Sequence, residues 1–264
     1  MADALAQTAK KMVAPGKGIL AADESNATIG KRFDKIGLVS TEEHRRDYRE
    51  LGARFAKWRA VIDIGPGMPS HNAINANAHA LARYAALCQE EGIVPIVEPE
   101  VLMDGPVAAH DIDTCYRVTE WTLKTVFEQL YYARIALDGM VLKPNMVIAG
   151  KNSPKQAAAG EVAEKTVRVL KSCVPPAVAG IAFLSGGQSD EQATEHLSLI
   201  NQIGRMPWPL TFSYGRALQA AAIATWGGKP ENVGAAQRAF HHRAKMNSLA
   251  AAGTWRRDLE KKAA

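Results

Sequence analysis

A lysine ends an apolar, strand-like run near the middle of the chain, where Lys143 follows Met140-Val141-Leu142 and precedes Pro144. Lysine is rarely buried, because its charged form loses hydration there, and burial lowers the pKa of the amine. A neutral amine can attack a carbonyl carbon. The same run also suits a lysine that snorkels to solvent at a strand end. On this segment alone, Lys143 is either a nucleophile or a surface side chain.

Two glutamates, Glu98 and Glu100, flank Pro99 at the end of another apolar run. Strand alternation points both side chains to the same side. Two close carboxylates raise the pKa of at least one of them, which suits general acid–base catalysis. The alternative interpretation is a pair of solvated surface side chains.

Further charged residues accompany the neighbouring runs. Lys57 and Arg59 are two residues apart and therefore share one side of a strand. If both face the same cavity as Lys143, repulsion among the cations lowers the pKa of the nucleophile further. Asp23, at the end of the first apolar run, adds another carboxylate.

Two consecutive loops have features of phosphate sites: Ser185-Gly186-Gly187-Gln188-Ser189 and Ser213-Tyr214-Gly215-Arg216. In the first, two glycines precede a helix N-terminus, where backbone N–H groups and the helix dipole favour an anion. In the second, the Arg216 guanidinium can bind two phosphate oxygens. A Gly-Gly pair alone more often marks only a tight turn. Together the loops predict phosphate binding, because the loops after the last two strands of a barrel enzyme often bind phosphate.

These residues follow or lie within six apolar runs, near 18–22, 53–62, 93–97, 140–142, 178–184 and 209–212. The segments between them have helical spacing, and Ser189 with Gln192 predicts a capping box for a helix through Ile203. Near-continuous apolar strands that alternate with helices predict a parallel sheet. Reactive residues at every strand end favour a (β/α)8 TIM barrel. A doubly wound sheet would place its glycines after the first strand, whereas Gly16-Lys17-Gly18 precedes it. The six strands are two fewer than a closed barrel of this type needs.

The composition restricts the class of protein. The 264 residues, 47% of them hydrophobic, suffice for one large α/β domain, and no apolar run is long enough to span a bilayer. The net charge of +5 is dispersed, which favours an anionic small-molecule partner over nucleic acid. Three unpaired-looking cysteines and an N-terminus without a signal-peptide pattern predict a cytoplasmic protein. The seven histidines form no i,i+4 pair beside an acid, so we expect no metal and no other cofactor.

Six motifs, taken in order, resemble class I fructose-bisphosphate aldolase of the bacterial type. They are Gly18-Ile19-Leu20-Ala21-Ala22-Asp23-Glu24-Ser25, Phe55-Ala56-Lys57-Trp58-Arg59, Val94-Pro95-Ile96-Val97-Glu98-Pro99-Glu100, Leu142-Lys143-Pro144-Asn145-Met146, Phe183-Leu184-Ser185-Gly186-Gly187-Gln188-Ser189 and Phe212-Ser213-Tyr214-Gly215-Arg216-Ala217-Leu218. The resemblance runs from about Met12 through Leu249, and such an ordered set is highly specific.

The resemblance implies a catalytic role for each of five residues. Lys143 would be the Schiff-base lysine that captures the C2 carbonyl of a ketose. Glu98 would shuttle protons during carbinolamine dehydration, and Asp23 would deprotonate the C4 hydroxyl to trigger cleavage of the C3–C4 bond. Lys57 would support charge in the site, and Glu100 is a further acid–base candidate beside Glu98.

The resemblance also implies residues that bind the two phosphates of the substrate. The 1-phosphate group would be bound by the two loops, through Ser185, Gly186, Gly187, Ser213, Gly215 and Arg216. Arg59 would lie near the other phosphate, and Ser25, Thr28 and Arg32 would approach the 6-phosphate. Asn26-Ala27 replaces the usual Thr-Gly of the family there, which weakens this second assignment. A homo-oligomer is compatible with the resemblance.

The sequence departs from the family between its first two motifs. The helix through Tyr48-Arg49-Glu50-Leu51 continues directly into Gly52-Ala53-Arg54-Phe55, so the second and third βα units, on the order of 60–80 residues, are absent. We expect a single aldolase barrel domain over residues 1–264, internally truncated near Leu51-Gly52. Loss of two adjacent strands exposes two parallel edges and opens the barrel. We therefore expect a chain of this sequence to fold poorly and to have little or no aldolase activity.

The implied function is cleavage of fructose 1,6-bisphosphate to dihydroxyacetone phosphate and glyceraldehyde 3-phosphate, in glycolysis and gluconeogenesis. Two alternatives stay open on the sequence. One is a non-catalytic remnant that binds a sugar phosphate, and the other is a Schiff-base lyase for another ketose phosphate.

Overall fold

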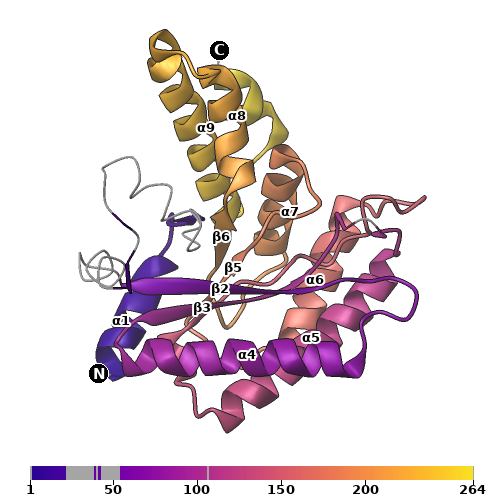
Figure 1. Cartoon of the computed structure of the whole chain (residues 1–264). Coiled ribbons are helices and arrows are strands. Elements are labelled where there is room, and N and C mark those ends of the chain that lie inside the picture. The colour runs from indigo at the N-terminus through magenta and orange to yellow at the C-terminus, as the bar shows by residue number, and fades with distance from the viewer. Residues whose placement is uncertain (1, 22–38, 40, 43–53, 106, 264) are drawn as a thin grey trace.

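The computed structural model describes residues 2–21, 39, 41–42, 54–105 and 107–263 (Figure 1). Four predicted site residues, Asp23, Ser25, Thr28 and Arg32, lie outside the described residues, as does the junction at Leu51-Gly52. The described part contains the six strands expected from the sequence. They are β1 (Ile19–Leu20), β2 (Phe55–Ile62), β3 (Val94–Val101), β4 (Val141–Leu142), β5 (Gly180–Phe183) and β6 (Leu210–Tyr214).

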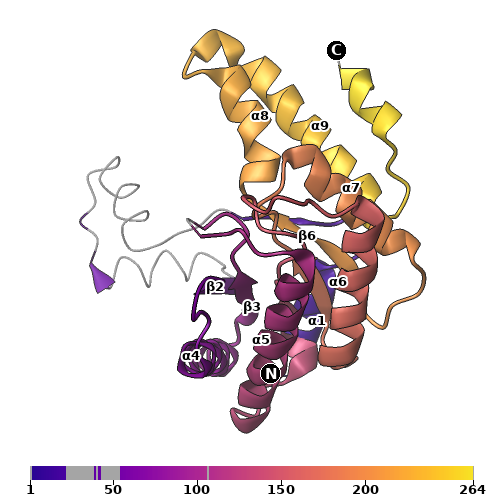
Figure 2. The same ribbon diagram turned by 90° about the vertical axis from the view of Figure 1, so that its right-hand side faces the viewer.

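The described helices are α1 (Ala2–Met12), α4 (His71–Glu90), α5 (Ile112–Tyr132), α6 (Ala159–Cys173), α7 (Asp190–Gln202), α8 (Arg216–Trp226) and α9 (Val233–Ala251), with short 3-10 helices η1 (Leu137–Gly139), η2 (Pro230–Asn232) and η3 (Arg257–Ala263). Helices α4 to α7 fall between successive strands, as in a βα barrel, whereas α1 precedes β1 and both α8 and α9 follow β6. Helices α8 and α9 lie side by side beyond β6 in both views (Figure 1, Figure 2).

The sheet is parallel throughout and has two edges. Its strand order is β1-β6-β5-β4-β3-β2, so β1 and β2 are its outer strands in the described part of the chain. Two further strands between β1 and β2 would complete an eight-stranded barrel. The predicted α/β fold class, with six parallel strands in the described part of the chain, is confirmed.

Strand alternation separates two apolar layers on the two faces of the sheet. Along β3, Ile96 faces the inside and Val97 the outside, and the same alternation holds for Val141 and Leu142 in β4. The inward layer packs against α1, whose Leu5 and other apolar residues fill the base of the curled sheet. This floor lies directly beneath the positions of Glu98 and Lys143, because inward-facing residues recur every second position.

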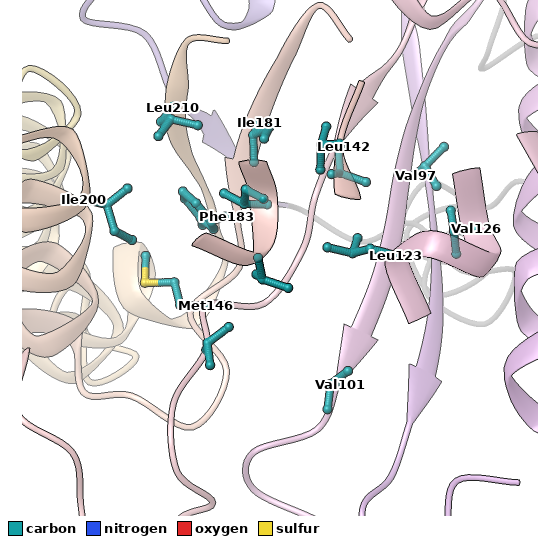
Figure 3. Close-up of a cluster of buried hydrophobic side chains, with 14 of the residues drawn as sticks. Val97, Val101, Leu123, Val126, Leu142, Met146, Ile181, Phe183, Ile200 and Leu210 are labelled. Atoms are coloured by element: carbon teal, nitrogen blue, oxygen red, sulfur yellow. The ribbon is translucent and has the colours of Figure 1, made fainter. Parts of the chain in front are cut away.

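The outward layer packs against the helices and forms the larger core (Figure 3). Leu142 and Phe183 of the sheet meet Leu123 of α5 and Ile200 of α7 there. The predicted capping box is present, since the Ser189 side chain accepts from the Gln192 backbone and the Gln192 side chain accepts from the Ser189 backbone. The predicted extent of this helix is wrong by one residue. It ends at Gln202, and Ile203 is 43% exposed.

Strand β2 shows the consequence of the open edge. It pairs with β3 along all eight of its residues but has no partner on its other side in the described part of the chain. Phe55 and Val61, on the inward side, are 43% and 44% exposed, whereas Ile62 is buried on the outward side against α4. Trp58, on the outward side as well, is 54% exposed, so the open edge leaves residues on both faces of β2 exposed.

Candidate active site

Lys143 lies inside the curled sheet and does not reach solvent. The residue is 4% exposed, and its Nζ lies 3.0 Å from Oε1 of Glu98. The backbone N–H of Lys143 donates to Val97 O at 2.8 Å, which continues the β3–β4 ladder and aims the side chain inward. The snorkelling interpretation of Lys143 is therefore wrong, because the side chain is buried and ends beside a buried carboxylate rather than in solvent.

Glu98 lies between two lysines. Its second oxygen, Oε2, lies 3.2 Å from Nζ of Lys57 but forms no hydrogen bond among the described residues. Glu98 therefore forms an ion pair with each lysine, through Oε1 with Lys143 and through Oε2 with Lys57. The register of the strands explains why Lys57 approaches Glu98. Strands β2 and β3 pair so that Arg59 lies beside Glu98, and both Lys57 and Arg59 lie on the same side of the sheet as Glu98.

Glu100 pairs with Arg59 one pleat further along the strands. The Arg59 Nε donates to Oε2 of Glu100, and this hydrogen bond raises the pKa of Arg59 above its ordinary value. Glu98 and Glu100 are both buried, so the interpretation as a solvated pair is wrong. Glu98 thus contacts Lys57 and Lys143, and Glu100 contacts Arg59. Glu98 and Glu100 share one side of the sheet as predicted, as do Lys57 and Arg59, and the register of β2 and β3 brings both pairs to the same side.

The first predicted phosphate loop approaches the carboxylates closely because its glycines lack side chains. A Cβ on Gly186 would lie 3.1 Å from Oε1 of Glu100. Gly187 has φ +73°, and a Cβ there would overlap the Met103 side chain. Gly187 is thus required twice, once by its left-handed backbone and once by space. Ser185, which opens this loop, is buried.

The second predicted phosphate loop brings Arg216 beside the first. Its guanidinium donates to Ser185 O at 3.2 Å and to Gln188 O, and its Nη1 lies 2.8 Å from Oδ1 of Asp190. Arg216 is about half exposed and borders a cavity of about 630 Å³. A carboxylate already lies at Arg216, so an incoming anion would compete with Asp190 for the guanidinium.

The other two residues of that loop are placed by β6 and α8. Ser213 is buried at 2% exposure, near the carboxyl end of β6. Gly215 precedes the first residue of α8, and a Cβ on it would lie 3.1 Å from Ala21 O, just after β1. Both predicted loops therefore lie at the carboxyl end of the parallel strands, as Lys143 and Glu98 do.

The sequence reasoning missed two buried polar side chains near these loops. Asn145 follows Lys143 by two residues and is 2% exposed. His196 of α7 lies with its Nδ1 2.6 Å from Oε1 of Gln188, and burial lowers its pKa to about 4. The sequence contains one indication that Asn145 is special, since it is an amide within an otherwise apolar run. It contains no such indication for His196, because the partner of His196 is Gln188, in a loop that the helical pattern around His196 does not identify.

Two further observations concern metals and membranes. The described residues hold no group of three or more histidine, cysteine, aspartate or glutamate side chains arranged to bind a metal ion. All three cysteines are free thiols, of which Cys115 is buried. None of the helices in the described ranges combines the length and the apolar character needed to cross a bilayer.

Known proteins share this sequence over almost its whole length. The family model "Glycolytic: Fructose-bisphosphate aldolase class-I" matches residues 4–51 and 47–264. A probable fructose-bisphosphate aldolase class 1 from Xanthomonas campestris pv. campestris is 46% identical over 331 residues, covering 96% of this chain and 98% of that protein. The fructose-bisphosphate aldolase of Dictyostelium discoideum is 42% identical, covering 96% of this chain and 93% of that protein.

A solved structure shares the fold. It is fructose-bisphosphate aldolase from Plasmodium falciparum in complex with TRAP and a small-molecule inhibitor. It superposes with a TM-score of 0.84 at 40% identity, covering 97% of this chain and 96% of that one.

The alignments also locate the absent units. The alignment to the Xanthomonas protein spans 331 residues whereas this chain has 264, so at least 67 aligned positions (331 − 264) have no residue in this chain. The family model divides its match between residues 47 and 51, next to the predicted junction. The sequence identity, the coverage, the fold and the ordered motifs all indicate the same family. This chain belongs to the class I fructose-bisphosphate aldolases, a family of enzymes.

Proposed function

We propose that this chain is a Schiff-base aldehyde-lyase that cleaves fructose 1,6-bisphosphate into dihydroxyacetone phosphate and glyceraldehyde 3-phosphate. The observation that carries the proposal is the buried contact of 3.0 Å between Lys143 Nζ and Glu98 Oε1. The proposal gives the buried amine of Lys143 the role of nucleophile and the buried carboxyl group of Glu98 the role of proton-transfer group. Both are needed to form an imine.

The reaction begins when the neutral amine of Lys143 attacks the C2 carbonyl of the ketose. Attack gives a nitrogen cation and an alkoxide, and Glu98 carries one proton from nitrogen to oxygen to form the neutral carbinolamine. A second proton, taken up from solvent by Glu98 and delivered to the hydroxyl, lets it leave as water while the nitrogen lone pair forms the C=N bond of an iminium. The resulting iminium withdraws electrons from the neighbouring C3–C4 bond. Lys57, 3.2 Å from Glu98, stabilises the carboxylate between proton transfers.

Cleavage follows when Asp23 removes the C4 hydroxyl proton. The C3–C4 bond then breaks, glyceraldehyde 3-phosphate leaves, and the electron pair remains as an enamine on Lys143. Protonation at C3 and hydrolysis of the imine release dihydroxyacetone phosphate and regenerate the amine. Glu100, held by Arg59, is the second carboxylate available near this carbon.

The phosphates are assigned to the two ends of the site. We assign the 1-phosphate to the paired loops, with Ser185, Gly186, Gly187, Ser213, Gly215 and Arg216 as its ligands. Support comes from the convergence of both loops on Arg216. Binding of this phosphate displaces Asp190 from the guanidinium. The 6-phosphate is assigned to Arg59 with Ser25, Thr28 and Arg32.

The setting of the reaction follows from the same assignment. We infer one domain over residues 1–264, truncated near Leu51-Gly52, and a cytoplasmic enzyme that binds a sugar phosphate and forms a homo-oligomer. The cytosolic relative from Arabidopsis thaliana, 42% identical, supports the location. The open edge at β2 admits water to the inner face, so we expect turnover well below that of relatives with all eight strands.

Borohydride trapping tests the proposal. The full-length protein is incubated with dihydroxyacetone phosphate and borohydride, and the modified lysine is identified by mass spectrometry. We expect one adduct, on Lys143, that Lys143→Met abolishes and that Lys171→Met leaves intact, because Lys171 is an exposed lysine of α6 and does not line the cavity at Arg216. An adduct on another lysine, or none, contradicts the catalytic proposal and leaves a phosphate-binding remnant. Cleavage rates for mono- and bisphosphate ketoses then separate this enzyme from a lyase for another ketose phosphate.

A further inference from the structure

Asn145 makes four hydrogen bonds from a fully buried position just beyond β4, the longest of them from its Nδ2 to Cys115 Sγ at 4.0 Å. Its Oδ1 accepts from the backbone N–H of Val101 at 3.1 Å. Its Nδ2 donates to Thr119 Oγ1 and to Met146 O, both at 3.0 Å. An amide buried at 2% exposure with both its oxygen and its nitrogen bonded is stabilising only while these partners remain in place.

The bond to Val101 matters because the backbone ladder between β3 and β4 is short. These strands pair at only two positions, Ile96 with Val141 and Val97 with Leu142, and the Lys143 N–H adds one bond to Val97 O. Beyond Val97, the half of β3 that carries Glu98 and Glu100 has no paired residue in β4. Asn145 bonds to this half at its far end.

Lys143 and Glu98 therefore lie between two fixed points. The ladder holds the two strands on one side of the pair, and the Asn145–Val101 bond holds them on the other. The end of β3 also pairs with β2, and Lys151 N donates to Met103 O further along the chain, but between Lys143 and Gly150 the described bond to β3 is the one from Asn145. Without this bond, the end of β3 can shift relative to the residues just after Lys143, and the 3.0 Å separation of the two side chains then varies.

We propose that Asn145 is a positioning residue that fixes Glu98 at hydrogen-bond distance from Lys143, and that it acts through the backbone N–H of Val101. The inference rests on the proposed function, since imine formation is the step that needs this distance. A misplacement of about 1 Å in such a pair can cost about a hundredfold in rate.

The same buried segment offers a matched control. The backbone N–H of Val147 donates to Thr166 Oγ1 at 2.9 Å, and Thr166 is as buried as Asn145. Thr166 belongs to α6, however, and the bond that it accepts comes from Val147 rather than from β3. Truncation of either side chain to alanine leaves one buried N–H without its acceptor. Only Asn145→Ala also releases β3.

The experiment compares full-length wild type, N145A, T166A and T119V by borohydride trapping at saturating dihydroxyacetone phosphate. We expect N145A to trap at least about tenfold more slowly than T166A, with a thermal midpoint no lower than that of T166A. We expect T119V to stay within about threefold of wild type, because it keeps the Val101 bond. Equal trapping by N145A and T166A overturns the proposal, and so does a T119V defect as large as that of N145A.

A second variant and a second readout cover the remaining outcomes. If N145A does not fold, N145D keeps an acceptor for the Val101 N–H at the same volume. Trapping within about threefold of wild type then supports the proposal, and a loss of about tenfold overturns it. If wild type itself does not trap, the proposed function fails. Acetic anhydride labelling of Lys143 then decides the inference: labelling at least about threefold faster in N145A than in T166A supports it, and equal labelling overturns it.

Discussion

Protonation of His196 should weaken the fold within a defined pH range. His196 lies in α7 against the first phosphate loop, with its Nδ1 2.6 Å from Oε1 of Gln188. Burial lowers the pKa of the imidazole to about 4 from an ordinary value of 6.5. The folded protein therefore keeps this ring neutral at a pH where the unfolded chain has already protonated it.

The sign and size follow from this difference in pKa. Between pH 6.5 and pH 4 the unfolded state binds a proton that the folded state does not, so the free energy of unfolding rises with pH across this range. One pKa unit corresponds to about 1.4 kcal/mol, so the whole range contributes about 3 kcal/mol. This contribution is complete above pH 6.5, is lost as the pH falls, and changes no further below pH 4.

Urea denaturation at intervals from pH 7.5 to pH 3.5 measures the effect. Replacing His196 by glutamine removes the titrating group, so the free energy of unfolding should fall by about 3 kcal/mol less in H196Q than in wild type. H79Q is the control, because His79 is an exposed histidine of α4 and its removal should leave the wild-type profile. Parallel profiles for wild type and H196Q would refute the assignment of this pH dependence to His196.

Two further predictions concern buried carboxylates. E98Q removes the carboxylate that lies 3.0 Å from Lys143. We expect the purified variant to form no borohydride adduct and to lose about 3 kcal/mol in its free energy of unfolding. An unchanged free energy of unfolding would contradict the buried ion pair. For Glu260, burial alone would raise the pKa, but hydrogen bonds from Arg243, His242 and Trp255 together hold it below its ordinary value of 4.5. Its stabilisation is therefore present above pH 4.5 and lost below it, so the stability difference between wild type and E260Q should shrink from pH 6 to pH 3 in urea titrations.

The sequence predicts the strands and the reactive pair well because both depend on local patterns. Apolar runs that end in polar residues mark β3 and β4, and alternation alone places Glu98 and Glu100 on one side. Lys143, which follows β4, could be assigned to the interior because the ends of several other strands carry charged residues that could face it. Here the local pattern and the tertiary arrangement agree.

The supporting contacts could not be predicted in this way. The bond from Val101 to Asn145 joins residues 44 positions apart, and nothing in either segment specifies it. Asp190 fits the sequence pattern of a helix first turn, which leaves no reason to expect it on Arg216. Such contacts depend on how closely two loops approach each other. Glycines such as Gly187 allow a close approach because they have no side chain, and only the folded chain shows which atoms a side chain there would overlap.

Side-chain exposure shows which step the missing units should impair most. Arg59 and Lys57, on the open-edge strand β2, are 47% and 22% exposed, whereas Glu98 and Lys143, one and two strands further in, are 4% and 5% exposed. The opening thus admits solvent to the side assigned to the 6-phosphate and leaves the lysine–carboxylate pair dry. Imine formation with dihydroxyacetone phosphate needs only the dry pair and the 1-phosphate loops. It should therefore survive in this chain better than cleavage of the bisphosphate, because cleavage also needs groups on the open side.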